Sequence, residues 1–179
     1  GNILDTQTVT GITDANWYTV NTEGVTVTAG NEYTIHVTYA GGPDELIIWY
    51  RDSNDPYAGG TSYYSDIAYS QYDLSFKTHV KGPDLLQYSI VDNPVNGTLN
   101  GLSSVQEDQS QASKGDAFDN ENTAQSFTAG QSGELDKVEV FLRGDMISSA
   151  TVIIREGSGT SGNILDTQTV TGITDANWY

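Results

Sequence analysis

Two short acidic stretches of the sequence could bind a metal ion. One runs from Asp52 to Asp55 and the other from Asp116 to Asn122. Calcium takes about six to eight oxygen ligands from such side chains and from the backbone. The candidate ligands are Asp52, Asn54, Asp55, Asp116, Asp119 and Glu121. Neither stretch matches the EF-hand pattern, and the same residue types form turns without an ion. Calcium binding and turn formation both stay open for 116–122, and turn formation is favoured for 52–55.

Aromatic side chains gather in a second region that could bind a ligand. Trp49 and Tyr50 are followed by a Gly- and Ser-rich stretch that contains Tyr57, Tyr63 and Tyr64. Ring faces beside polar groups can hold sugars. Tyrosines in a sandwich more often pack in its core or along its rim. The sequence therefore gives an alternative function, a carbohydrate-binding β-sandwich module that uses exposed Trp and Tyr side chains.

The sequence contains no motif of enzymatic catalysis. It lacks a GxSxG elbow, an HExxH helix, a P-loop and a GxGxxG loop. Only two histidines occur, His36 and His79, and we interpret them as unrelated surface residues. With 24 acidic residues, some carboxylate pair will lie at glycosidase spacing by chance. We expect the protein not to be an enzyme.

Composition limits the partners further. The chain has 7 basic and 24 acidic residues among 179, a formal net charge of −17. This charge argues against nucleic acid and anionic membrane surfaces as partners, since both attract Lys and Arg. Cysteine is absent, so disulfides and thiolate metal sites are excluded. No apolar run approaches the ~20 residues of a membrane span, so we expect no membrane insertion.

The strongest signal in the sequence is an exact internal repeat. The segment Gly1–Tyr18 returns unchanged as Gly162–Tyr179, at an offset of 161 residues. The first copy continues into a strand-like segment that the second copy lacks, and the second follows Ala150–Glu156, which the first lacks. A strand needs partners on both sides. Joining 106–161 to 1–80 through a single copy would therefore complete one unit, and the chain is predicted to be one period of a head-to-tail repeat.

Three explanations of the repeat compete. Identical modules could follow one another covalently in a long protein, or separate chains could each lend a strand to the next. An engineered permutation could also keep the shared segment at both ends. Strand lending would leave every chain with a surplus strand, so covalent repetition is favoured. The residues expected to be buried at the seam between units are Ile3, Leu4, Val9, Ile12, Trp17, Ile164, Leu165, Val170, Ile173 and Trp178.

Alternating polar and apolar residues predict strands throughout. In Tyr33–Tyr39 the odd-numbered residues are apolar or aromatic and should face the core, while Thr34 and His36 should face solvent. Leu46–Tyr50 is apolar throughout, as in a strand covered on both faces. Gly157–Gly162 should connect a hairpin. Sustained helical periodicity is missing, so the pattern predicts an all-β, antiparallel β-sandwich with almost no helix.

Several segments resemble a known class of module. They are Gln125–Ala129, Gly133–Val138, Ile154–Gly159, Val25–Ile35 and Asp73–Thr78. In permuted order, they are similar to the β-sandwich (jelly-roll-like) modules of large secreted bacterial surface and adhesin proteins. The resemblance covers roughly 19–80 and 124–179. A further stretch, Gln87–Leu99, is similar to the start of cadherin-like or bacterial Ig-like repeats. The resemblance implies a location outside the cell or at the bacterial cell surface, in an adhesion or scaffold role.

These observations together predict how the chain is organised. Residues 1–80 would form the C-terminal part of a sandwich module, and 81–123 a connector with short strands and an acidic loop. Residues 124–179 would form the N-terminal part of the same or the next module. The expected function is that of a structural repeat unit of an extracellular fibre, stalk or adhesin, whose partners are identical copies of itself.

Overall fold

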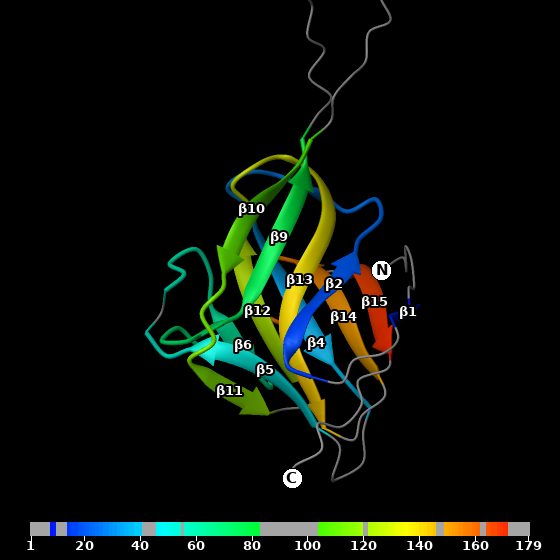
Figure 1. Cartoon of the computed structure of the whole chain (residues 1–179). Helices are drawn as coiled ribbons and strands as arrows, with labels where there is room; N and C mark the ends of the chain where they lie inside the picture. The colour runs from blue at the N-terminus through cyan, green and yellow to red at the C-terminus, as the bar shows by residue number, and fades with distance from the viewer. Residues whose placement is uncertain are drawn as a thin grey trace, which may run out of the picture.

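The computed structural model describes residues 8–9, 14–40, 46–54, 56–82, 104–119, 122–145, 149–161 and 164–171. Within these residues the chain forms strands and turns but no helix, and two antiparallel sheets pack against each other (Figure 1). The predicted all-β antiparallel sandwich is confirmed. The strands are β1 (Thr8–Val9), β2 (Asn16–Asn21), β3 (Thr26–Val27), β4 (Glu32–Thr38), β5 (Leu46–Asp52), β6 (Ser62–Tyr64), β7 (Ile67–Tyr69), β8 (Asp73–Leu74), β9 (Phe76–Lys81), β10 (Val105–Gln111), β11 (Asp116–Asp119), β12 (Asn122–Thr128), β13 (Gly133–Asp145), β14 (Ser149–Glu156) and β15 (Ile164–Thr171).

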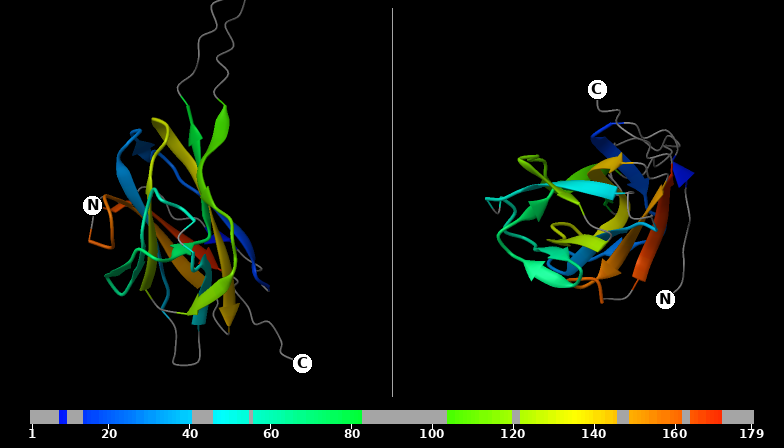
Figure 2. Two further views of the ribbon diagram at one scale, coloured as in Figure 1. Left: turned by 90° about the vertical axis from the view of Figure 1, so that its left-hand side faces the viewer. Right: turned by 90° about the horizontal axis from the view of Figure 1, so that it is seen from below.

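The two sheets draw their strands from both halves of the chain. Sheet 1 has the order β1-β15-β14-β4-β12-β6-β7, and sheet 2 has the order β10-β9-β13-β5-β11. Strands β2 and β3 also pair with β13, and β8 pairs with β5. In sheet 1, β4 lies between β14 and β12, and in sheet 2 β13 lies beside β2 and β9 (Figures 1 and 2). The two parts of the sequence therefore share one core.

Part of the expected connector belongs to the sandwich. In the segment 81–123, β10 pairs with β9 and β11 pairs with β5, so both strands extend sheet 2. The stretch that resembles the start of an Ig-like or cadherin-like repeat lies outside the described residues. The boundary of the sandwich along the chain is thus set by strand pairing, which includes residues 105–111 and 116–119.

Burial follows the predicted alternation in β13. Val138, Val140 and Leu142 are 0 % exposed, whereas the neighbouring residues Lys137 and Glu139 are half-buried. Successive side chains of a strand point to opposite faces, so these alternate apolar residues enter the core, while Phe141 lies on the other face against Trp17. The hairpin between β14 and β15 is also present, with antiparallel pairing on both sides of its connection.

Two strands are buried differently from the prediction. The apolar residues of β4 face the core as expected, but Thr34 and His36 are buried too, 0 % and 5 % exposed. The turn after β14 accounts for Thr34, because the Thr34 hydroxyl donates to the carbonyl of Gly157 at 2.7 Å. In β5 only Ile47 and Trp49 are fully buried, while the alternate residues are half-buried. Its second face is therefore only partly covered.

A buried polar cluster connects the two sheets inside the core. Asp73 of β8 is 0 % exposed, and its carboxylate accepts from the backbone N–H of Tyr57 at 2.8 Å and from Gln125 Nε2 at 3.1 Å. Gln125 of β12, also 0 % exposed, accepts from the N–H of Leu74 at 2.8 Å. Since β8 joins sheet 2 and β12 joins sheet 1, these bonds fix one sheet against the other.

Replacing Asp73 by Asn should destabilise the sandwich. The amide nitrogen of Asn cannot accept a hydrogen bond, so one buried donor, from Tyr57 or Gln125, would lose its acceptor. Such a loss costs roughly 1–3 kcal/mol, measured as a lower urea midpoint. The control is Asp52→Asn, where Asn can still accept from the N–H of Asn54 and the change should stay within about 0.5 kcal/mol. Equal midpoints for Asp73→Asn and wild type would contradict the bridging role.

Candidate functional site

The repeated segment occupies separate places in the two sheets. The second copy supplies β15, which pairs with β14 in sheet 1. The first copy supplies residues 16–18 of β2, which pairs with β13 in sheet 2, and also β1, which lies beside β15. Of the expected seam residues, Val9 and Val170 are described by their backbone alone. The seam residues outside the described part of the chain are Ile3, Leu4, Ile12, Ile173 and Trp178.

Strand β1 pairs with its own twin. Thr8 lies opposite Thr169 and Val9 opposite Val170, so each residue faces its equivalent 161 positions along the chain. The pairing is parallel, in contrast to the antiparallel pairing of β15 with β14. Strand β1 therefore covers part of the edge of sheet 1 that β15 would otherwise expose.

The end of β15 and the start of β2 lie at the same end of the sandwich. Thr171 pairs with Ser149, the first residue of β14, and Asn16 pairs with Leu142 near the end of β13. Strands β13 and β14 follow each other in the chain and pass from sheet 2 to sheet 1 at this end. Strands β15 and β2 also contact each other.

One unbroken copy of the repeat could supply both strands. Within a copy, the equivalent of Thr171 is Thr10, and only residues 11–13 separate it from Asp14. The four Cα-to-Cα steps between them span at most roughly 13–14 Å when fully extended, compared with the ~10 Å between packed sheets. In this chain the second copy supplies β15 and the first copy supplies the start of β2.

Among the β15 side chains that the structure describes, the two that are fully buried are polar. Asp166 and Gln168 are 0 % and 2 % exposed, and Gln168 Nε2 donates to Asp166 Oδ1 at 3.4 Å. The expected seam residues Ile164 and Leu165 are half-buried, and Leu165 packs against the core. The sequence analysis missed Asp166 and Gln168 because it ranked the segment by apolarity. Their spacing of two residues was the signal that could have placed them on one face.

The side chain of Trp17 does not enter the core, which lies between the two sheets. Trp17 is half-buried, and its ring packs edge-on against the ring of Phe141, with 5.4 Å between the two ring centroids. Lys77 Nζ lies 4.7 Å from the centroid of the Trp17 ring. The residues of β2 that face the core are Tyr18 and Val20, 8 % and 4 % exposed. Trp17 therefore packs against β13 and β9 instead of entering the core.

The expected ligand-binding aromatics divide between core and surface. Trp49 is 0 % exposed and its Nε1 donates to the carbonyl of Ser75 at 2.8 Å. Tyr57 is 9 % exposed, and burial raises its pKa to about 12. Tyr50 is half-buried and packs edge-on against Phe141 at 5.1 Å. Trp49 and Tyr57 therefore offer no open ring face to a ligand, because both occupy inward positions.

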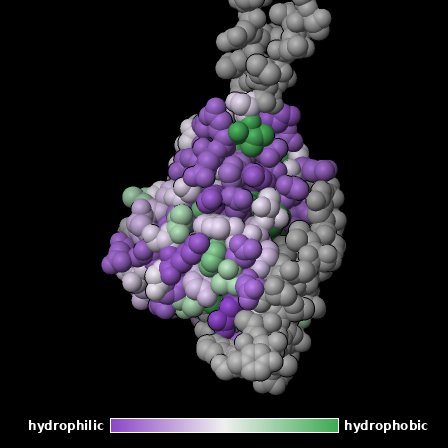
Figure 3. Space-filling model, viewed as in Figure 1, coloured by the Kyte–Doolittle hydropathy of each residue, from purple (hydrophilic) through white to green (hydrophobic). Residues whose placement is uncertain are grey.

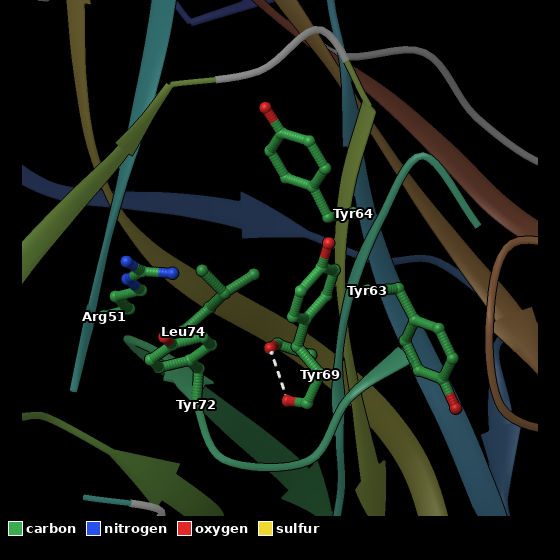
Figure 4. Close-up of a pocket in the computed structure, with 7 residues that line it drawn as sticks. Arg51, Tyr63, Tyr64, Tyr69, Tyr72 and Leu74 are labelled. Carbon is green, nitrogen blue, oxygen red and sulfur yellow. Dashed lines mark hydrogen bonds between the residues drawn. The ribbon is translucent and has the colours of Figure 1, made fainter. Parts of the chain in front are cut away.

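Tyr64 does line a small depression at the edge of the sandwich. Its walls come from β6 and β7 of sheet 1 and from β5 and β8 of sheet 2, with the segment before β8 between them. The lining residues are Arg51, Ser62, Tyr63, Tyr64, Tyr69, Tyr72 and Leu74. The ring of Tyr63 points away from the others (Figure 4) and lies against the turn at Gly159, where an added Cβ would be 3.5 Å from it. The sequence analysis left Arg51 and Leu74 out of this site.

Strands β5 and β11, which lie at the two acidic stretches, are neighbours in sheet 2. Asp116 lies opposite Arg51 in the register of β11 and β5, and Arg51 Nη2 donates to Asp116 Oδ2 at 3.1 Å. The backbone N–H of Ala117, and then Arg51, lower the pKa of Asp116. Asp52 Oδ1 accepts from the backbone and side-chain nitrogens of Asn54 at 2.9 and 2.8 Å, and these bonds lower the pKa of Asp52.

The arrangement at 52–54 is that of a side-chain turn. In the described part of the chain, no group of three or more His, Cys, Asp or Glu could hold a metal ion. Asp55 and Glu121 lie outside that part, and Asp119 is described by its backbone alone. Calcium binding at these stretches stays a prediction.

Calcium removal tests this prediction directly. Bound calcium would hold carboxylates of the 116–122 stretch together and stabilise the folded state, so EDTA should lower the melting temperature by several degrees. Adding calcium back should restore it, while magnesium, which prefers a smaller and more rigid site, should restore less. Identical melting curves with and without EDTA would rule out a stabilising calcium ion.

The two histidines lie in different sheets and do not form one site. His36 of β4 is 5 % exposed, its Nδ1 accepts from Arg155 Nε at 3.3 Å, and its Nε2 bonds to Asn122. His79 of β9 is half-buried, with Nε2 3.1 Å from a carboxylate oxygen of Glu139. The expectation of a surface position is wrong for His36, because its ring is enclosed beside the side chains of Asn122 on β12 and Arg155 on β14.

His36 should make stability depend on pH. Burial, and to a smaller extent the charge of Arg155, lower its pKa below the usual value near 6.5. Between the lowered pKa and about 6.5 the unfolded chain binds more protons, so the free energy of unfolding should fall as pH falls through this window. Comparing wild type with His36→Gln at about pH 8 and pH 5.5 isolates the effect. A difference in unfolding free energy that is the same at both pH values would contradict it.

Family models, curated proteins and solved structures were all compared with the chain, and none matches it. In the described residues, no helix is long and apolar enough to cross a membrane. The similarity of some segments to adhesin modules stays a prediction from the sequence.

Proposed function

We propose that the chain is one period of a structural repeat protein, in which identical β-sandwiches follow one another head to tail. The repeated segment is the seam at which one period passes into the next. The protein is an extracellular fibre, stalk or adhesin of a bacterial surface. Its role is mechanical, because stability in such arrays is summed over modules and the contacts between neighbours.

The observation that carries this proposal is the division of the repeat between the sheets. One sandwich uses β15 from the second copy and β2 from the first, and their facing ends can be bridged by residues 11–13. The unused half of the first copy forms β1, beside its twin. A window cut inside a periodic chain would carry such a surplus.

Surface character supports contact through the seam. The net charge of −17 makes the broad faces of two copies repel each other. The face shown in Figure 3 is largely hydrophilic over β9 and β10. Two copies can still pair through the edges of their strands, because such pairing uses backbone N–H and C=O groups and does not require contact between the charged faces.

Covalent repetition is the preferred form of the array. In a strand-lending polymer each chain would carry two equal strands for one groove, and the surplus would leave an edge open to further pairing. In a covalent array each copy of the repeated segment would supply strands to one sandwich, and no copy would be left over. An engineered permutation ranks third, because it explains why the chain carries two copies of the segment but gives no reason for sandwiches to assemble head to tail.

Truncation tests whether the two copies share one place. Removing residues 1–13 keeps β2 and β15, so the sandwich should fold. Removing 162–179 should also leave it folded, because residues 3–10 can replace β15 and run through 11–13 into β2. Removing both segments deletes β15 altogether, which should cost at least ~4 kcal/mol, or roughly 10 °C in melting temperature.

The single truncations serve as controls for the double one, and all four chains are compared in thermal melts followed by circular dichroism. If the chain without 162–179 melts as early as the doubly truncated chain, the copies are not interchangeable. The proposal that the repeat is a seam would then be wrong.

The mass of the natural protein under denaturing conditions tests the form of the array. A band far above 19.3 kDa supports covalent repeats. Filaments that dissolve on denaturation into a single band at that mass support strand lending instead. A natural chain of that mass that stays monomeric in native buffer would contradict head-to-tail assembly in both forms.

A further inference from the structure

We propose that strand β7, at the edge of sheet 1, pairs with the same strand of a second copy of this chain, so that sheet 1 continues from one copy into the other. Strand β7 is the last strand in the order of sheet 1 and lies beside β6. The contact is side by side and uses no residue of the repeated segment. It therefore differs from the head-to-tail seam and does not rest on the proposed function.

The hydrogen bonds of the hairpin β6–β7 show which backbone groups of β7 point outward. The N–H of Ser65 donates to the carbonyl of Asn122 on β12 at 3.0 Å. Tyr63, two residues earlier, points its backbone groups to β12 as well, because bonding directions alternate along an antiparallel strand. Tyr63 lies opposite Ala68, so these two residues exchange no bonds. The N–H and C=O of Ala68 therefore point away from β6, to a side where no described strand pairs with β7.

The edge at β7 lacks the features that keep most strand edges from pairing. Natural edge strands carry charged side chains, Pro or a bulge. Residues 67–72 contain no charge and no Pro, and Ile67 is 59 % exposed. By contrast, the edge strand β10 carries Glu107 and Asp108 with a register shift beside them, and β11 begins and ends with Asp. Strand β7 thus presents an uncharged and exposed edge to another strand.

The sequence around Ala68 is complementary to itself, which identifies the partner as a second copy. In an antiparallel pair centred on Ala68, the two Ala68 residues exchange both N–H···O=C bonds. Ile67 of each copy then lies opposite Tyr69 of the other, and pairs of β-branched and aromatic side chains stabilise a sheet. Asp66 of each copy lies opposite Ser70 of the other, so like charges do not face each other. A two-fold axis relates the two halves of this contact.

Charge favours this edge over the broad faces as the place of contact. The chain has a net charge of −17, so two copies resist stacking face against face. Pairing through β7 joins uncharged residues by their backbone groups and leaves the charged faces of the two sandwiches side by side.

The contact is small, because β7 has only three residues, Ile67–Tyr69. Stable protein interfaces bury roughly 1,200 Å² or more, which so short an edge does not reach. Single copies should therefore associate weakly. Copies linked in an array should associate more tightly, because each pair holds the next pair at a high effective concentration.

Self-association of the full chain is measured by sedimentation velocity at concentrations up to about 1 mM, which reaches weak complexes. The wild type should form a dimer as its concentration rises. Ala68→Pro removes the outward N–H and should weaken the dimer at least about tenfold, and the hairpin tolerates Pro where the N–H faces solvent. The matched control is Ala68→Val, which keeps the N–H and suits a strand, so it should dimerise as the wild type does.

Disulfide trapping tests the register of the pair. The chain has no cysteine, so Ala68→Cys introduces a single thiol. Residues directly opposite each other lie about 5.5 Å apart between Cα atoms, within the range of ~4.4–6.8 Å for disulfides. Mild oxidation should therefore trap the Ala68→Cys dimer. The control is Ser70→Cys, at an exposed position of the same segment, which would lie opposite Asp66 and should be trapped far more slowly.

The proposal is overturned if the wild type stays monomeric at about 1 mM, if folded Ala68→Pro dimerises as the wild type does, or if Ser70→Cys is trapped as fast as Ala68→Cys. Thermal melts check the folding of each variant, and the two Cys variants decide if Ala68→Pro unfolds. None of these variants changes residues 1–18 or 162–179. The truncation tests of the repeat are therefore unaffected, and the two proposals can fail separately.

Discussion

The pairing of β13 is the constraint on which both sheets depend. This strand pairs with β2, β3, β5 and β9, and it leads directly into β14 of sheet 1. Strand β14 in turn holds β15. The positions of both halves of the repeat are therefore set by one pair of consecutive strands. Because β13 and β14 cross between the sheets at one end, the end of β15 and the start of β2 lie near each other there.

Polar groups inside the core make the packing of the sheets specific. Apolar contacts alone tolerate sliding of one sheet over the other, whereas the bonds from Asp73 to Tyr57 and Gln125 are satisfied in one relative position. Asp166 and Gln168 place polar groups in the core at the repeat as well.

The depression beside the tyrosines lies at the edge of sheet 1 that the hairpin β6–β7 forms in the described part of the chain. Its walls belong to different sheets, so its shape follows from the packing that Asp73 and Gln125 fix. The hairpin β6–β7 is at the edge of sheet 1, and adjacent tyrosines in β6 point to opposite faces. One of them, Tyr64, contributes to the depression, while Tyr63 covers the outer face of sheet 1 (Figure 4).

The sequence by itself determined the class of fold, because alternation in segments such as 138–142 and glycine-rich turns act locally. It also located the repeat and the tyrosine-rich region. It did not determine that Trp49 is enclosed or that Arg51 meets Asp116, since these depend on strand register between distant segments. The clearest case is the repeat: Thr8–Val9 and Thr169–Val170 have identical sequences but different partners. The local sequence cannot distinguish the two copies. The tertiary structure decides which strands each copy pairs with, because the segments that flank a copy in the chain determine where it lies.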